Sequence, residues 1–247
     1  MRRVKRLVLA GEVQADLASK QTATDRKRMD GALDVAAEWQ SARQTNSLKT
    51  VLATLHRMMG EYQRCMYCLD SHGTDIDHFW PKKQFPNRMF VWPNLLLCCT
   101  ECGRFKGDEF PLSNGQPLLI DPTADDPWLH LDFDLLTGNI VAKFHPDQID
   151  YSEKGSKTVE VLHLDRREAL ASGYQKTFRR LASRVREALS QPTPSANDLI
   201  TSLREADDHG LLGWCFRASG QDEPPFRDLR IKHPKLWVEC VTAFQEI

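Results

Sequence analysis

Two pairs of cysteines constrain the fold of this chain more than any other feature of its sequence. The first pair is Cys65 and Cys68, the second is Cys99 and Cys102, and each has the spacing Cys-x-x-Cys. A turn with this spacing directs two thiolates toward one cation, and two such turns complete the tetrahedral coordination of Zn²⁺. Buried free thiols would explain one pair, but two pairs around one insert favour a metal. We therefore predict that these four cysteines bind one structural Zn²⁺.

The other cysteines do not extend this pattern. Cys98 directly precedes Cys99, but only Cys99 has the Cys-x-x-Cys spacing to Cys102. Cys215 and Cys240 lie in apolar surroundings with helical periodicity, which is typical of core thiols. The total of seven cysteines is odd, which also favours metal ligation over a set of disulfides.

The balance of charges limits what the surface can bind. The formal net charge is -1 at pH 7, which excludes a uniformly basic nucleic-acid binder and leaves only a local basic patch. The apolar run after the basic N-terminal residues ends at Gly11 and is too short for a secretory signal. No stretch approaches the roughly 18 apolar residues of a membrane span. We expect a cytoplasmic protein that does not enter a membrane.

Residue patterning divides the chain into three segments. Residues 1–62 show helical spacing of apolar side chains after a basic start, and residues 63–111 crowd together cysteines, aromatic residues and turn formers. Residues 112–247 are again mainly helical in periodicity. We predict an α+β protein, mainly helical, in which a zinc-stabilised module lies between N-terminal and C-terminal helical segments.

Local signals predict individual elements in the helical segments. Ser47 is a candidate N-cap for a helix through residues 48–59. Alternating residues on both sides of a turn at 137–139 predict a β-hairpin after the module. Asp165 is a candidate cap for a long amphipathic helix. The basic face of that helix, which includes Arg167, is either solvated or a surface for a phosphate or a partner.

The insert between the cysteine pairs contains the dipeptide Asp77-His78. A carboxylate binds a hard divalent cation through oxygen, and an imidazole that is neutral near pH 7 can take a proton from an attacking water. The cation would offset charge on a scissile phosphate. A hydrogen-bonded pair on a loop would explain an isolated Asp-His, but its position between two zinc turns favours phosphodiester cleavage.

Four motifs together resemble the HNH nucleases and their ββα-metal fold: Cys65-x-x-Cys68, Asp77-His78-x-x-Pro81, Asn94-Leu95, and Cys99-x-x-Cys102 with Lys106. The HNH subunit of Septu-type anti-phage defence systems, relatives of which occur with retrons, is more specifically similar to residues 78–82, Trp92, 94–97 and 106–111. In those systems the subunit works beside an ATPase subunit. The resemblance covers roughly residues 47–190.

The resemblance implies a role for each motif residue. His78 would be the general base, Asp77 a ligand of a catalytic Mg²⁺ or Mn²⁺, and Asn94 the residue that ties the hairpin loop and orients His78. The chain would then be a metal-dependent HNH endonuclease that hydrolyses DNA in a defence complex with an ATPase partner. No GxxxxGK[ST] loop occurs in the sequence, so control by ATP would come from that partner.

The chain departs from the family pattern at Gly103. Many family members place an asparagine or a histidine directly after the last cysteine, where it helps to hold the catalytic cation. Glycine offers no ligand, so another group or water completes the site, or metal binding is weaker. Asp75 is a candidate, because it precedes Asp77 by two residues and shares its strand face. Asp108 and Glu109 are weaker candidates, because they lie past the second cysteine pair.

Basic residues surround these motifs, and we predict that they contact a nucleic-acid backbone: Lys82, Lys83, Arg104 and Lys106. An ordinary solvated loop would explain any one of them, whereas the group suggests phosphate contacts without sequence preference. Two alternatives stay open. In the first, the substrate is RNA instead of DNA, because RNA presents the same phosphodiester. In the second, the chain is a catalytically weakened zinc module that binds nucleic acid or a partner.

Overall fold

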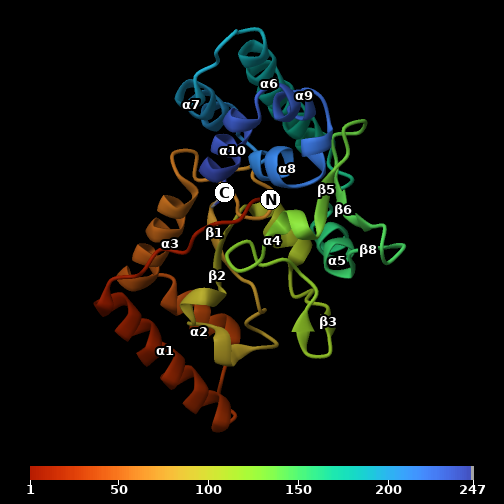
Figure 1. The fold of residues 1–247 in the computed structure, drawn as a ribbon. Coiled ribbons are helices and arrows are strands. Elements are labelled where there is room, and N and C mark those ends of the chain that lie inside the picture. The colour runs from red at the N-terminus through yellow and green to blue at the C-terminus, as the bar shows by residue number, and fades with distance from the viewer. Residues whose placement is uncertain (246–247) are drawn as a thin grey trace.

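The computed structural model describes residues 1–245 (Figure 1). The helices are α1 (Gly11–Met29), α2 (Val35–Ala42), α3 (Asn46–Met59), α4 (Thr100–Lys106), α5 (Glu153–Leu162), α6 (Glu168–Leu189), α7 (Ala196–Ala206), α8 (Leu212–Arg217), α9 (Phe226–Lys232) and α10 (Pro234–Ala243). The strands are β1 (Asp75–His78), β2 (Leu95–Cys98), β3 (Leu112–Ser113), β4 (Gln116–Pro117), β5 (Leu131–Phe133), β6 (Ile140–Ala142), β7 (Phe144–His145) and β8 (Asp150–Tyr151). The strands form separate two-stranded antiparallel sheets, β1 with β2, β3 with β4, β5 with β6 and β7 with β8. This arrangement confirms the predicted α+β class with mainly helical content.

A strand–strand–helix unit occupies the middle of the molecule, where β1 and β2 form a hairpin and α4 follows (Figure 1). The register pairs Asp75 with Cys98 and His78 with Leu95. All four residues of β2 are buried, so this strand is a continuous apolar run rather than an alternating one. The hairpin therefore lies inside the protein, with other elements packed on both of its faces.

The N-terminal helices lie at one end of the molecule and the C-terminal helices α6 to α10 gather at the other (Figure 1). Buried side chains from all of these parts form one hydrophobic cluster, which includes Leu17 of α1, Leu97 of β2 and Phe226 of α9. The central hairpin is thus held from both ends by packing. Among residues 1–245, no helix is both long and apolar enough to cross a membrane.

Two of the predicted helix caps are wrong. Helix α3 begins at Asn46, so Ser47 lies inside its first turn rather than at its N-cap. Helix α6 begins at Glu168, and its N-cap position is Arg167 rather than Asp165. A polar side chain near a helix start can bind a partner other than the helix backbone, and Asp165 forms an ion pair with its neighbour Arg166.

The β-hairpin predicted around residues 137–139 is confirmed, since β5 pairs with β6 there. Its turn requires glycine at position 138, where φ is +80° and a Cβ atom would lie 2.6 Å from the carbonyl oxygen of Ala171. The turn therefore packs directly on the backbone of α6.

Candidate metal centre and active site

The four cysteines of the two pairs come together in space. Their Sγ atoms all lie within 4.8 Å of one another, and all four side chains are buried. They form the one group of three or more metal-ligating side chains found among residues 1–245. Four thiolates converging from two turns are the donor set of a structural Zn²⁺ site. The geometry fits the predicted zinc.

Local structure holds the two pairs in place. Cys65 and Cys68 lie in the loop between α3 and β1, and Cys99 is the N-cap residue of α4, where its Sγ accepts a hydrogen bond from the backbone nitrogen of Cys102 at 3.4 Å. Burial raises the pKa of the Cys65 thiol well above its usual value. A bound Zn²⁺ would reverse this effect, because the ion binds the thiolate and releases its proton.

Arg167 supports the cysteine cluster from outside the central unit. Its Nη1 donates to Cys102 Sγ at 3.3 Å, and its Nη2 forms an ion pair with Glu101. Only 8% of its side chain is exposed. Four thiolates leave a zinc centre with net negative charge, which this guanidinium would offset. Sequence reasoning assigned Arg167 to a surface helix face, because nothing local connects it to a cysteine 65 residues earlier.

His78 is at the end of β1 and is 2% exposed. Its Nε2 lies 3.0 Å from the carbonyl oxygen of Met89. A carbonyl only accepts, so Nε2 carries the proton and donates, which leaves Nδ1 as the basic nitrogen. The edge of Trp39 packs against the imidazole with 4.3 Å between ring centroids. Burial, and after it the charge of Lys82, lower the pKa of His78 to about 3, so the ring is neutral near pH 7.

Asp77 belongs to the same strand as His78, but its side chain projects from the opposite face. Its Oδ2 accepts a hydrogen bond from the Tyr67 hydroxyl at 2.7 Å and forms an ion pair with Lys106 Nζ at 3.2 Å. The same Nζ donates to the carbonyl oxygen of His78 at 2.8 Å. Asp77 and His78 are therefore coupled through Lys106 rather than by direct contact.

Asn94 ties the two sides of the loop that joins β1 to β2. Its Oδ1 accepts from the backbone nitrogen of Trp80 at 2.7 Å, and its Nδ2 donates to the carbonyl oxygens of Trp80 and Arg88 at 3.1 and 2.9 Å. The side chain is 3% exposed. Its amide hydrogen-bonds to the loop backbone and not to His78, whose ring is oriented by the Met89 carbonyl.

We predict that Asn94→Ala lowers the free energy of unfolding by about 3 kcal/mol, because it leaves a partly buried N–H and two partly buried carbonyls unpaired. Urea denaturation of the variant and the wild type measures the difference. Asn87→Ala is the control, since Asn87 is exposed in the same loop and its loss should be nearly neutral. An Asn94→Ala protein as stable as the control would contradict this account of the loop.

Of the remaining predicted site residues, Lys106 contacts Asp77 and the carbonyl of His78, and the charge of Lys82 acts on His78. The other three have different surroundings. Asp75 is exposed and pairs with Arg43 at 2.9 Å. Lys83 is exposed and lies 3.8 Å from Asp108, and Arg104 is also exposed. Lys106, predicted as a backbone contact, has no exposed surface. No local pattern predicts this burial, because a lysine is ordinarily solvated.

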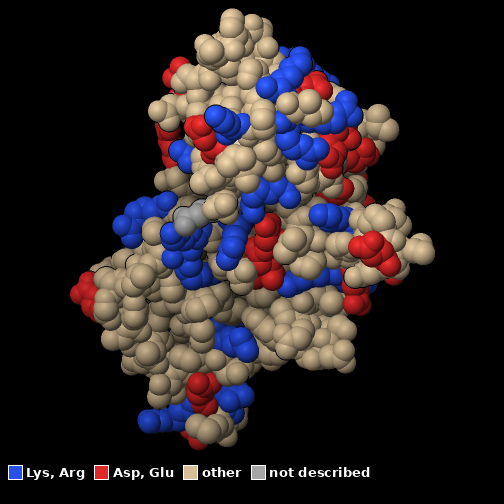
Figure 2. Space-filling model, viewed as in Figure 1, with Lys and Arg blue, Asp and Glu red and all other residues tan. Residues whose placement is uncertain are grey.

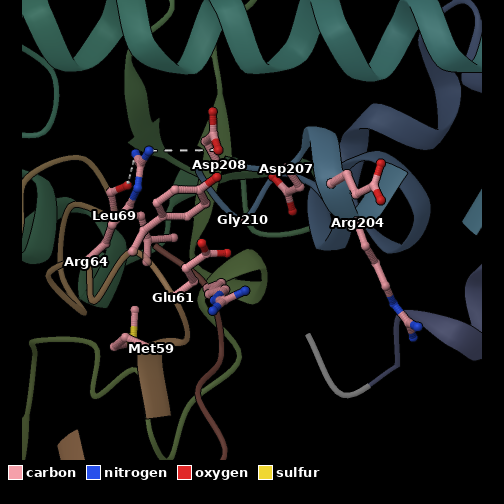
Figure 3. A pocket seen from close by; sticks show the side chains of 11 residues that line it. Met59, Glu61, Arg64, Leu69, Arg204, Asp207, Asp208 and Gly210 are labelled. Atoms are coloured by element: carbon pink, nitrogen blue, oxygen red, sulfur yellow. Dashed lines mark hydrogen bonds and ion pairs between the residues drawn. The ribbon is translucent and has the colours of Figure 1, made fainter. Parts of the chain in front are cut away.

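The surface carries no single basic patch on the face seen in Figure 2, where Lys and Arg side chains form separate groups interspersed with acidic ones. A cavity of about 390 Å³ opens beside the first cysteine pair (Figure 3). Its charged lining is mixed, and Arg64 and Asp208 pair across it at 3.8 Å. None of the predicted site residues lines it, and its balanced charge does not favour a polyanion.

Comparisons with known proteins relate part of the chain to one kind of protein. No protein-family model matches it. The Septu protein PtuB of Bacillus thuringiensis is 33% identical over 112 residues, which are 43% of this chain and 38% of that protein. The Septu protein PtuB of Bacillus mycoides (strain KBAB4) is 32% identical over 136 residues, 42% of this chain and 44% of that protein. The chain thus spans less than half the length of these curated relatives.

Proposed function

We propose that this chain is a phosphodiester hydrolase of the HNH type that cleaves DNA in an anti-phage defence complex with an ATPase partner. The activity is inferred from the surroundings of His78. Its neutral imidazole is fixed through Nε2 by the Met89 carbonyl, and it belongs to the β1–β2 hairpin that the four-cysteine cluster holds. The similarity to the Septu proteins PtuB supports the defence role.

In the proposed reaction, a water oxygen attacks phosphorus and Nδ1 of His78 takes the proton that the water loses. The new P–O bond forms as the bond to the leaving oxygen breaks, and the leaving oxygen takes a proton from solvent. Lys82, Lys83 and Arg104 lie near the site in sequence and would contact neighbouring phosphates, which gives binding without sequence preference.

The catalytic Mg²⁺ or Mn²⁺ that the resemblance implies stays a prediction, and the side chains around Asp77 do not fit such an ion as they lie. One carboxylate is present, and its Oδ2 is already bound by Tyr67 and Lys106. Gly103 offers no ligand, and Asp75 is paired with Arg43. Divalent Mg²⁺ needs several oxygen ligands. No step of the proposed reaction is therefore assigned to a divalent cation.

Cleavage of supercoiled plasmid and of RNA, with the native partner present, tests the proposal. Nicked or linear plasmid in the presence of wild-type protein supports a DNA nuclease. Breakdown of RNA while the plasmid stays intact would identify RNA as the substrate. If neither is cut, with or without Mg²⁺ or Mn²⁺, the enzyme proposal fails and the chain is a zinc module for binding, a reading that Gly103 favours.

Trp39 of α2 packs against the imidazole of His78 with 4.3 Å between the ring centroids, so it would have to move for a substrate to approach from that side. We predict that Trp39→Ala increases both the cleavage rate and the reactivity of His78 toward diethylpyrocarbonate, read by mass spectrometry of the peptide that contains it. The same change should cost about 3 kcal/mol of stability, since it removes a buried aromatic ring.

The control for this prediction is Trp92→Ala. Trp92 is also partly buried, but it packs against Arg6 and donates to the Leu7 carbonyl, so its loss should leave His78 covered. Equal reactivity of His78 in the wild type and in Trp39→Ala would show that Trp39 does not limit access.

A further inference from the structure

Lys106 is a charged residue enclosed inside the central unit. It is the last residue of α4, and its side chain is 0% exposed. Lysine is almost never fully buried unless its charge is paired. The ammonium is held by the Asp77 carboxylate at 3.2 Å and the His78 carbonyl oxygen at 2.8 Å. It therefore lies between β1 and α4, in contact with both residues of the Asp-His dipeptide.

This ammonium binds one of the two carboxylate oxygens that Asp77 could offer to a divalent cation. Its Nζ and the Tyr67 hydroxyl both bind Oδ2 of the carboxylate. A second cation on the same carboxylate would lie a few ångströms from the ammonium in an enclosed site, where charges repel strongly. The positive charge beside Asp77 is therefore already supplied by Lys106.

A second observation points the same way. Gly103 precedes Lys106 by one turn of α4 and provides no ligand. A Cβ atom there would meet only the Sγ of Cys98, at an ordinary contact distance of 3.6 Å. Space for a larger side chain therefore exists at this position, and crowding does not explain the glycine.

We propose that the Lys106 ammonium takes the place of a divalent cation at this site, so that phosphodiester cleavage proceeds without added Mg²⁺ or Mn²⁺. The inference rests on the proposed function. Lys106 is a positioning residue: it fixes the carbonyl of His78 and the carboxylate of Asp77. In this proposal its fixed charge would also offset negative charge on a phosphate bound beside His78.

The experiment compares cleavage with and without Mg²⁺ in buffer freed of divalent cations by a chelating resin, with zinc content measured before and after. The wild type should cut at similar rates in both. Lys106→Met should cut roughly 10²–10³-fold more slowly without divalent cations and should gain a dependence on Mn²⁺, because Asp77 has then lost its cationic partner. Lys106→Arg, which keeps the charge, should retain cation-independent cleavage.

Two controls separate this role from a structural one. Lys49→Met removes an exposed lysine on α3 and should not change the cation dependence. Methylammonium should restore part of the rate to Lys106→Ala, provided that zinc content and thermal unfolding show a folded protein. A merely structural lysine would alter stability without creating a dependence on Mn²⁺.

The outcomes distinguish the proposed role of Lys106 from the proposed nuclease activity. A wild type that cuts only with added Mg²⁺ or Mn²⁺ overturns the role of Lys106 and leaves the proposed nuclease intact, and this comparison needs no variant to fold. Cation-independent cleavage that Lys106→Met does not reduce also overturns it. A wild type that cuts no nucleic acid under any condition, with its partner present, overturns the nuclease itself.

Discussion

Replacing His78 by alanine is expected to abolish phosphodiester cleavage. The imidazole of His78 is neutral near pH 7, and its Nε2 is held by the Met89 carbonyl at 3.0 Å, which leaves Nδ1 to accept a proton. Loss of a general base costs roughly 10²–10⁴ in rate, which removes a visible product band in a nicking assay. Neither Mg²⁺ nor Mn²⁺ should restore the activity, because the missing step is transfer of a proton.

His78→Gln is the more discriminating variant, because its amide can still donate to the Met89 carbonyl but cannot accept the proton of water near pH 7. Zinc content and thermal unfolding of this variant should match those of the wild type. His72→Ala is the control, since that histidine is largely exposed. If His78→Gln retained more than about a tenth of the wild-type rate, His78 would not be the base.

The second large effect concerns the cysteine cluster. We expect about one zinc per chain in the purified protein, and Cys102→Ser should lose it together with the folded state of the hairpin. Zinc binding in small modules contributes about 10 kcal/mol or more to folding. Here the cluster holds both the loop before β1 and the start of α4, so its loss should release both.

Metal analysis and thermal unfolding measure this effect, and Cys98→Ala is the matched control. Cys98 is buried next to Cys99 but lies outside the group of four ligands. That variant should keep its zinc. A Cys102→Ser protein that still held one zinc per chain, or a Cys98→Ala protein that lost it, would show that the ligands have been assigned wrongly.

The features that could be predicted from the sequence are those with a local or chemical signature. The spacing of Cys65, Cys68, Cys99 and Cys102 is such a signature, and their Sγ atoms meet within 4.8 Å. The alternation around Gly138 is another, and it predicts the β5–β6 pairing. Both signals reflect geometry that a few neighbouring residues determine by themselves.

Contacts between distant parts of the chain could not be predicted in this way. Trp39 covers His78 from a separate helix, and Lys106 binds Asp77 across the interface between β1 and α4. Neither contact leaves a trace in periodicity or spacing. The sequence therefore predicts that Lys106 contacts a nucleic-acid backbone, whereas packing encloses its side chain beside the Asp77 carboxylate.

The cysteine cluster also has a consequence for oxidation. Cys68 Sγ lies 3.9 Å from Cys99 Sγ, so a modest movement would bring the two sulfurs to the roughly 2.05 Å of a disulfide. Without zinc, an oxidant such as dioxygen would take two electrons from these thiols as two protons leave. The resulting disulfide would join the two cysteine pairs and remove two of the four ligands. Added zinc could then not rebind until a reductant had cleaved the disulfide.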